Sequence, residues 1–586
     1  MEVMRSSEAL RSSANRYLLE VNNHYGLRGS ISVEQDTLHF AKCASVEGMA
    51  PTGTIQTLTP MIAPAPTTET QASATLILPA RIGDVVKPWA ETRPDHPALL
   101  EASGTWTYLE LASAISHTQT WLCNSGVRPG DRVMIVGENS REFVAMLLAS
   151  AGVDAWPVLV NSRLSTREVE AIRDHCGARR VLYTTSVSPH AADHAKRHSA
   201  QVEELRGLGI IGISSLNDSA QTEPLDENIP DRVAALIYTS GTTGLPKGVM
   251  LSHRNLLFLA AGSAKIRSLT ADDRLYGILP MSHAVGLSVV LLGSLLSGAS
   301  LYLSPRFDPM TARLTLEKER LTVMLGAPAT FTQFLQYAKM RGVESLKFPA
   351  LRIISSSGAQ LHSSTKLAVE RLFGMPLHNG YGVTECSPTI AQTRVDAPRS
   401  DTSIGPPFPG VEIKLVGPDR NAVAAGEAGE LWVRGPNVMK GYYRAPEETA
   451  AVIDAEGWFN TRDLARLEDG NLFIVGRTKD LIVHHGFNVY PAEVEAVLNA
   501  HPAVAQSAVI GRSVEGDEEV VAFVQLLPDS TLTATDLVEY AARHLAPYKR
   551  PSQILLVPTM PVTPTGKVVK AELAKMLERP SAAMTT

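Results

Sequence analysis

Short apolar runs alternate with amphipathic stretches along most of the chain. The runs have the length of buried strands and lie at residues 132–136, 156–160, 180–183, 301–303, 322–325 and 351–354. Between them, residues 142–151 and 166–175 place apolar side chains at helical spacing. Alternating strands and helices predict an α/β fold with layered sheets. Residues 285–296 form a longer apolar stretch, but it falls short of the ~20 residues of a spanning helix and predicts a buried helix.

The pattern changes in the last third of the chain. After a Gly- and Pro-rich segment, strand-like runs at 413–416 and 430–433 predict a small β subdomain. A compact α+β unit of about a hundred residues follows, comparable to a small domain. Its predicted elements are a helix from Pro491, strands at 505–510 and 519–527, and a helix at 534–546 with Thr533 as its N-cap.

These patterns divide the chain into four parts. Residues 79–479 form a large N-terminal domain, residues 480–577 form a small C-terminal domain, and residues 578–586 form a tail. Residues 1–78 are rich in Ser, Thr, Ala and Pro and show no sustained period, so we predict a disordered N-terminal extension.

Composition narrows the class of protein. The 586 residues are too many for one core, and a formal charge of −6 with interspersed signs offers no basic surface for nucleic acid. The four cysteines, Cys43, Cys123, Cys176 and Cys386, are far apart and favour a reducing compartment. We expect a cytoplasmic protein with no transmembrane segment and no nucleic-acid partner; a homodimer is compatible with the sequence.

The most informative segment is Tyr-Thr-Ser-Gly-Thr-Thr-Gly-Leu-Pro-Lys-Gly-Val at residues 238–249, directly after the apolar run 233–237. Glycines let backbone N–H groups converge on an anion, hydroxyl groups add donors, and Lys247 adds a point charge, so the loop is suited to phosphate. Its spacing differs from the G-x-x-x-x-G-K-[ST] loop of P-loop NTPases. The alternative is an ordinary Gly-, Ser- and Thr-rich surface loop.

Other short segments follow in a fixed order. They are Pro-Met-Ser-His at 280–283, Ser-Gly-Ala at 357–359, Asn-Gly-Tyr-Gly-Val-Thr-Glu-Cys-Ser-Pro at 379–388, Trp-Phe-Asn-Thr-Arg-Asp at 458–463, Gly-Arg-Thr-Lys-Asp at 476–480, His-Gly-Phe-Asn-Val-Tyr-Pro at 485–491 and Pro-Val-Thr-Pro-Thr-Gly-Lys at 561–567. Together with the phosphate loop they resemble the adenylate-forming (ANL) superfamily, and within it the acyl-CoA synthetases, or AMP-dependent acid–CoA ligases. The resemblance covers roughly residues 78–573.

The resemblance implies an ATP and Mg²⁺ site. The phosphate-binding residues would be Thr239, Ser240, Gly241, Thr242, Thr243, Gly244 and Lys247. The adenine and α-phosphate would contact Gly358, Ala359, Asn379, Gly380, Tyr381, Gly382 and Thr384. Asp463 would accept hydrogen bonds from the ribose, Arg477 would contact ribose or phosphate, and Glu385 with Thr239 would hold Mg²⁺, which prefers oxygen ligands.

The resemblance also implies that the C-terminal domain is a mobile lid. Lys479 would be its hinge, Gly486 would line the coenzyme A tunnel, and Lys567 would be catalytic together with Lys247. His283 would be a catalytic gate to the acyl pocket. Three residues depart from the family pattern: Arg462 replaces a glycine, and His484 and His485 replace smaller or aliphatic residues.

The implied activity is a two-step ligase reaction in which a carboxylic acid and ATP form an acyl-adenylate, which then reacts with coenzyme A. Apolar residues around 284–291, without an evident charged anchor, favour a fatty acid and a role in lipid metabolism. An aryl or hydroxycinnamic acid is the second alternative. A stand-alone adenylation enzyme that loads a carrier protein is the third; no aspartate stands near His283 or before Tyr381 to bind an ammonium group.

Overall fold

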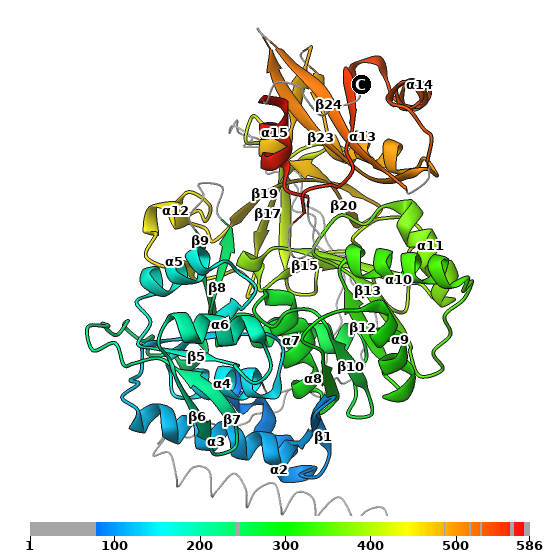
Figure 1. The fold of residues 1–586 in the computed structure, drawn as a ribbon. Helices are drawn as coiled ribbons and strands as arrows, with labels where there is room; N and C mark the ends of the chain where they lie inside the picture. Colours follow the sequence, from blue (N-terminus) through cyan, green and yellow to red (C-terminus); the bar gives the residue numbers. More distant parts are fainter. Residues whose placement is uncertain are drawn as a thin grey trace, which may run out of the picture. The chain divides into compact units, whose positions relative to one another are not determined.

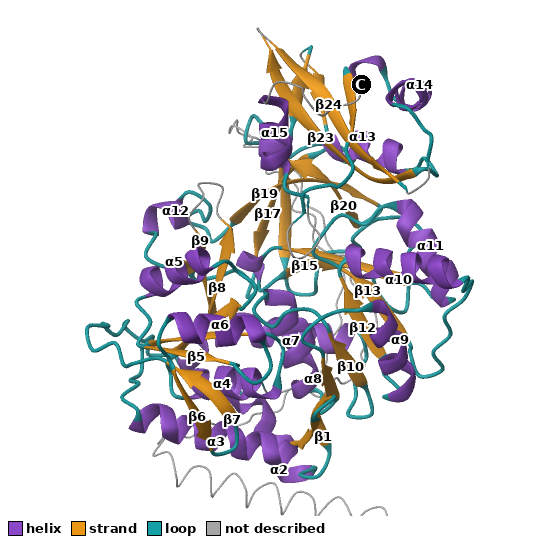
Figure 2. Cartoon of the chain, viewed as in Figure 1, coloured by secondary structure: helices purple, strands orange, loops and turns teal. Residues whose placement is uncertain are grey.

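The computed structural model describes residues 78–240, 246–485, 487–514, 517–527, 530–562 and 568–578. The predicted disordered extension lies outside these ranges up to residue 77. So do residues 241–245 of the phosphate loop, Gly486, Lys567 and the tail from residue 579. Figure 1 follows the described elements along the chain, and Figure 2 separates helices from strands.

One large sheet of the N-terminal domain is mostly parallel. Within the described ranges its strand order is β15-β14-β13-β12-β10-β11-β1-β2, and only the outermost pairs, β14 with β15 and β1 with β2, are antiparallel. Its strands are β1 (Pro97–Glu101), β2 (Gly104–Thr107), β10 (Arg274–Gly277), β11 (Ser300–Leu303), β12 (Val323–Gly326), β13 (Ile353–Ser356), β14 (Leu377–Gly382) and β15 (Thr389–Gln392). Covered parallel strands are apolar on both faces, which explains their continuous apolar runs.

The second large sheet has a parallel centre and antiparallel flanks. Among the described strands the order is β18-β9-β8-β4-β3-β5-β7-β6, with β8, β4, β3 and β5 parallel. Its strands are β3 (Arg132–Gly137), β4 (Trp156–Asn161), β5 (Arg180–Tyr183), β6 (Gln201–Leu205), β7 (Gly209–Ile213), β8 (Val233–Ser240), β9 (Pro246–Ser252) and β18 (Gly441–Tyr442). The layered α/β architecture predicted from the sequence is confirmed.

Helices separate and cover the two sheets (Figure 2). They are α2 (Lys87–Thr92), α3 (Tyr108–Asn124), α4 (Arg141–Gly152), α5 (Thr166–Cys176), α6 (Pro189–Arg197), α7 (His253–Ile266), α8 (Gly293–Leu296), α9 (Pro309–Lys318), α10 (Pro328–Arg341), α11 (Ser363–Phe373) and α12 (Pro446–Ala450). Helix α4 contacts β3 and β4 of one sheet and β1 of the other, and residues 142–151 are all buried. A helix covered on every side is apolar all round.

The apolar stretch 285–296 is helical and buried, as predicted, but most of it is wound as a π-helix. This segment, η3 (Val285–Leu292), continues into α8. A Cβ on Gly286 would lie 2.1 Å from the Pro280 carbonyl oxygen, so only glycine fits at this position. No helix of the described ranges combines the length and apolarity that a bilayer span requires.

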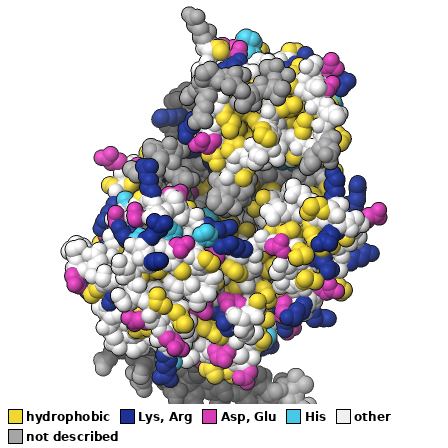
Figure 3. Space-filling view, viewed as in Figure 1, with side chains coloured by type: hydrophobic (Ala, Val, Ile, Leu, Met, Phe, Trp, Pro, Cys, Tyr) yellow, Lys and Arg dark blue, Asp and Glu magenta, His cyan; other side chains and the backbone are white. Residues whose placement is uncertain are grey.

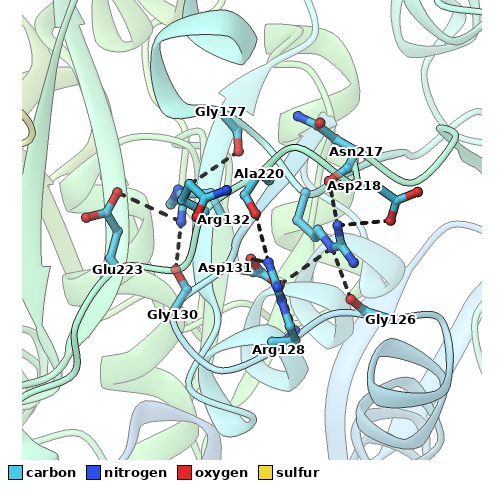
Figure 4. Close-up of polar contacts among 12 residues, drawn as sticks. Gly126, Arg128, Gly130, Asp131, Arg132, Gly177, Asn217, Asp218, Ala220 and Glu223 are labelled. Atoms are coloured by element: carbon cyan, nitrogen blue, oxygen red, sulfur yellow. Dashed lines mark hydrogen bonds and ion pairs between the residues drawn. The ribbon is translucent and has the colours of Figure 1, made fainter.

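Three arginines bind the long connection between β7 and β8 (Figure 4): Arg132 and Arg179 are buried, and Arg128 is exposed. Arg128 donates to the Ala220 carbonyl at 2.8 Å, and Arg179 donates to the Asn217 carbonyl at 2.6 Å. Arg132 is fully buried and donates to backbone carbonyls of neighbouring loops. Because buried charges require such partners, this network holds the chain that leads into β8 in one position.

The remaining chain forms a β subdomain and a C-terminal domain with its own core, as predicted. The subdomain sheet has the order β16-β17-β19-β20 and comprises β16 (Glu412–Val416), β17 (Gly429–Arg434), β19 (Phe459–Glu468) and β20 (Asn471–Arg477). The C-terminal elements are β21 (Ile482–His484), β22 (Phe487–Val489), α13 (Pro491–Asn499), β23 (Val504–Val514), β24 (Asp517–Leu526), α14 (Ala534–His544), β25 (Gln553–Leu556) and α15 (Lys570–Glu578). Thr533 caps α14, as predicted.

Charges of both signs are interspersed on the face of the molecule that Figure 3 shows.

Candidate active site

Both ends of the predicted phosphate loop belong to paired antiparallel strands, so the segment outside these strands is shorter than the sequence suggests. Strand β8 continues to Ser240, and β9 begins at Pro246. Thr239 pairs with Lys247 across the hairpin. Only residues 241–245 connect the two strands. The predicted loop over 238–249 is therefore too long, because antiparallel pairing extends both strands towards the turn. Lys247 thus lies on the pleated backbone of a strand.

Lys247 is connected to Glu385 through one aromatic side chain. Its ammonium group lies 5.2 Å from the ring centroid of Tyr442, and the Tyr442 hydroxyl donates to Glu385 Oε1 at 2.8 Å. Burial, and next the Glu385 carboxylate, raise the pKa of Tyr442, so the phenol keeps its proton and remains a donor. The predicted phosphate-binding lysine and the predicted metal-binding carboxylate therefore share one fixed neighbour. Sequence reasoning missed Tyr442.

Glu448 on α12 forms an ion pair with Lys247. The side chain of Lys247 is 23% exposed and that of Glu448 is 47% exposed, so solvent reaches the pair. Sequence reasoning missed Glu448 as well. Its only signal was a carboxylate shortly after Pro446, and acidic residues are common in the first turn of any helix, so the sequence offered no reason to pair it with Lys247. A phosphate at Lys247 would compete with this carboxylate for the ammonium group.

A second cluster joins side chains of three strands, β14, β19 and β20. The Tyr381 hydroxyl donates to Asp463, and Arg477 Nε lies 2.9 Å from Asp463 Oδ1. Asp463 is only 3% exposed. Burial first, and then the Asp463 charge, raise the pKa of Tyr381. The structure therefore brings together Tyr381, predicted to stack on adenine, Asp463, predicted to contact ribose, and Arg477, predicted to contact ribose or phosphate.

The pair with Asp463 favours the charged form of Arg477. Burial lowers its pKa, but the charges of Asp463 and its neighbours outweigh burial, and the pKa is raised overall. Strand pairing places Asp463 opposite Arg477 in the β19–β20 register. The pair is therefore built into the pairing of β19 with β20.

Arg462 stands where the family pattern has glycine, and its backbone explains the preference. Its φ is 59°, in the left-handed region that glycine adopts without strain. Its main-chain N–H donates to Asn460 Oδ1 at 2.8 Å, and its side chain is exposed. The chain therefore keeps the backbone geometry beside Asp463 in spite of the substitution.

Some residues of segment 379–388 that are predicted to bind the nucleotide also make contacts that stabilise the fold. The Asn379 side-chain amide donates to the Thr402 carbonyl at 3.2 Å, so this amide supports a neighbouring loop. A Cβ on Gly382 would lie 1.9 Å from the Pro388 carbonyl oxygen, and one on Gly380 would contact the Gln392 side chain at 3.4 Å. The close approach at Gly382 is thus set by the β14–β15 turn. A role of these residues with adenine remains a prediction.

The half-buried Thr384 and Glu385 lie in the short helix η4 (Thr384–Cys386). Glu385 offers a carboxylate and Thr239 offers a hydroxyl, which are the oxygen donors that Mg²⁺ prefers. Tyr442 donates to one carboxylate oxygen of Glu385, as a neighbour that orients a metal ligand would. The residue types therefore fit the predicted metal.

Three predicted segments leave the same edge of the mostly parallel sheet. Residues 280–283 follow β10, residues 357–359 follow β13, and residues 383–385 follow β14. Ligands of open α/β sheets bind at the carboxyl ends of parallel strands. Gly358 has a φ of 87° and is exposed, and Ala359 is half-buried.

His283 lies just before η3 and is exposed, yet surrounding protein atoms lower its pKa by desolvation, with a smaller effect from Arg163. This location fits the predicted gate.

Of the predicted lid residues, only Lys479 is described. It lies exposed in the short helix η5 (Thr478–Asp480), directly after β20. Gly486 and Lys567 fall outside the described residues, so their roles remain predictions.

Comparison with known proteins assigns the chain to a family. The AMP-binding enzyme profile matches residues 86–443, and the profile of the AMP-binding enzyme C-terminal domain matches residues 493–567. The chain belongs to the AMP-binding enzyme family. It is an AMP-forming acid–thiol ligase.

Named relatives extend over most of the chain. A feruloyl-CoA synthase from Amycolatopsis sp is 33% identical over 83% of this chain and 97% of its own length. 4-Coumarate–CoA ligase 1 from Oryza sativa subsp. japonica is 33% identical over 77% of this chain and 84% of its own. The crystal structure of ATP-bound MatB from Rhodopseudomonas palustris aligns with a TM-score of 0.74 and 28% identity, covering 85% of this chain and 99% of MatB.

Proposed function

We propose that this enzyme activates an aromatic, hydroxycinnamate-type acid with Mg·ATP and transfers the acyl group to coenzyme A. The observation that carries the proposal is the 33% identity to a feruloyl-CoA synthase over 97% of that protein's length. It favours the aryl acid over the fatty acid that apolar composition suggested, and the expected role in lipid metabolism is not supported. Many hydrophobic acids need an apolar pocket, so composition alone does not separate these classes.

In the first step, a carboxylate oxygen of the acid forms a bond to the α-phosphorus, and the bond from that phosphorus to pyrophosphate breaks. The reaction depends mainly on alignment and charge neutralisation. Lys247 provides a positive charge for the phosphates, and Tyr442 orients Glu385 by donating to it. Mg²⁺, when bound, would supply further neutralisation of the phosphate charges. Lys567 would neutralise charge from the lid.

Asp463 and Arg477 act on the nucleotide in this proposal. Asp463 has a carboxylate oxygen for ribose hydroxyls, and its bond to Arg477 holds that carboxylate in place. Tyr381 is positioned by its hydroxyl bond to the same carboxylate, which leaves the ring face for adenine. The three side chains thus define one orientation for the nucleoside.

In the second step, the thiol sulfur bonds to the acyl carbon, the bond from that carbon to the AMP oxygen breaks, and the thiol proton is lost. Rotation about Lys479 would exchange Lys567 for the segment of Gly486. An exposed residue between β20 and β21 has the freedom that such a hinge needs.

Pyrophosphate release with Mg·ATP tests the proposal, using ferulate, 4-coumarate, benzoate, fatty acids and amino acids, each with and without coenzyme A. We expect turnover with the hydroxycinnamates that depends on coenzyme A. Turnover restricted to fatty acids would overturn the substrate class. Pyrophosphate release from an amino acid that coenzyme A does not accelerate would favour loading of a carrier protein.

A further inference from the structure

Two histidines and one aspartate converge at the turn between β21 and β22. His484 Nδ1 lies 3.1 Å and His485 Nδ1 lies 2.9 Å from the same oxygen, Asp517 Oδ2. The two imidazole rings lie 3.9 Å apart, centroid to centroid. One ligand atom from each of the three residues lies within 4.8 Å of the others. His484 and His485 are also two of the three residues that depart from the family pattern.

The backbone holds these side chains in place. The His485 main-chain N–H donates to Asp517 Oδ1 at 2.8 Å, which orients the carboxylate, and the Val483 N–H donates to Glu518 Oε2 at 2.7 Å. His485 has a φ of 52°, in the left-handed region that non-glycine residues rarely adopt. Such conformations persist where the surroundings impose them, often at ligand-binding positions.

The geometry has a chemical consequence. Both Nδ1 atoms lie within hydrogen-bonding distance of the one oxygen Asp517 Oδ2, whose lone pairs can accept a donor from each ring. A single divalent ion can instead accept lone pairs from both nitrogens and from the carboxylate. In a tetrahedral site with bonds of about 2.0–2.1 Å, ligand atoms are ~3.3 Å apart. The observed separations of 2.9 and 3.1 Å are close to that value.

We propose that His484, His485 and Asp517 form a binding site for a divalent transition-metal ion such as Zn²⁺. Two imidazoles and a carboxylate suit Zn²⁺ and disfavour the harder Mg²⁺. The three protein ligands leave a fourth position for water. His484 Nδ1 also lies 2.5 Å from the Glu518 carbonyl oxygen, so metal binding replaces a hydrogen bond at this nitrogen. The bound ion joins the β21–β22 turn, next to Gly486 in the sequence, to the start of β24.

Titration of the chelator-treated full-length protein with Zn²⁺ in excess Mg²⁺ tests the proposal by calorimetry. We expect about one equivalent to bind. His485→Gln and Asp517→Asn should each weaken Zn²⁺ affinity on the order of tenfold to a hundredfold. His544→Gln is the matched control, since it removes an exposed histidine of α14 in the same domain and should leave affinity unchanged.

Failure of the wild-type protein to retain Zn²⁺ in excess Mg²⁺ would overturn the proposal. So would unchanged affinity in His485→Gln, whose ring is 70% exposed and can be replaced without disturbing the core. Thermal unfolding of each variant without metal verifies that it is folded. The measurement uses the metal alone, so its result does not depend on the proposed substrate or on activity.

Discussion

The two cation–carboxylate pairs of the candidate site differ in how they are built. Arg477 and Asp463 face each other on paired strands, with the carboxylate buried. Lys247 and Glu448 meet across separate elements, and both remain partly exposed. Breaking a buried ion pair that strand register holds in place lowers the free energy of unfolding strongly, whereas breaking an exposed pair lowers it little. The first pair is therefore suited to holding a nucleoside in place, and the second to exchanging its carboxylate for a phosphate.

Lys247→Met should have the largest effect. Loss of one charge-neutralising donor typically reduces the rate of such a step by about a hundredfold or more. Stability should change by less than ~1 kcal/mol, because the ion pair with Glu448 is exposed. Pyrophosphate release and urea denaturation measure the two quantities. A large loss of stability with normal turnover would reverse our distinction between the pairs.

Asp463→Asn should weaken ATP binding by roughly tenfold, because the ribose loses a charged acceptor. It should also destabilise the domain, since Arg477 loses its partner. We expect about 1–2 kcal/mol, below the ~3–5 kcal/mol of a fully buried pair, because the Arg477 side chain is 39% exposed. The KM for ATP and the denaturation midpoint provide the measurement. An unchanged midpoint would contradict a structural role for the pair.

Tyr442→Phe removes the hydroxyl that donates to Glu385 and keeps the ring beside Lys247. A hydrogen bond to a charged group contributes about 1.5–3 kcal/mol, but a bound metal would compensate part of the loss. We expect turnover to fall about fivefold and the Mg²⁺ concentration for half-maximal rate to rise. Tyr443→Phe on the adjacent residue is the control. Equal effects at both positions would refute the specific role of Tyr442.

Glu448→Gln should act in the opposite direction and more weakly. With the competing carboxylate removed, phosphate binding at Lys247 becomes easier by the ~0.2–1 kcal/mol of an exposed ion pair, which lowers the KM for ATP up to about fivefold. Glu447→Gln changes the neighbouring glutamate of α12, which has no ion pair with Lys247 in the described residues, and serves as control. A raised KM in Glu448→Gln would show that the carboxylate helps binding.

Arg462→Gly should have the smallest effect, and it concerns stability. A non-glycine residue with φ of 59° is strained by ~1–2 kcal/mol, partly offset by the greater freedom of glycine in the unfolded chain. The net gain should be about 0.5–1 kcal/mol in chemical denaturation. Arg462→Ala is the control and should not stabilise. A destabilised glycine variant would show that the exposed side chain contributes contacts.

The sequence by itself determined the layered α/β domain, the β subdomain and the α+β C-terminal domain, because local periods of apolar residues suffice for such predictions. It also located the candidate phosphate loop, since glycine and hydroxyl spacing is a local property. The candidate metal residues came from the resemblance to the family. The sequence did not determine the substrate class, because the apolar residues around 284–291 suit a fatty acid and an aryl acid alike.

Only the tertiary structure decided which side chains meet. Tyr442 contacts Lys247 and Glu385 because β18 pairs with β9, and Tyr381 reaches Asp463 from 82 residues away. The amide of Asn379 supports a neighbouring loop, a role that no spacing pattern indicated. Such contacts depend on strand pairing between segments that are distant in the sequence, whereas a sequence pattern relates only residues that are close together along the chain. The candidate site residues could therefore be predicted from the sequence, but the side chains that they contact could be identified only from the tertiary structure.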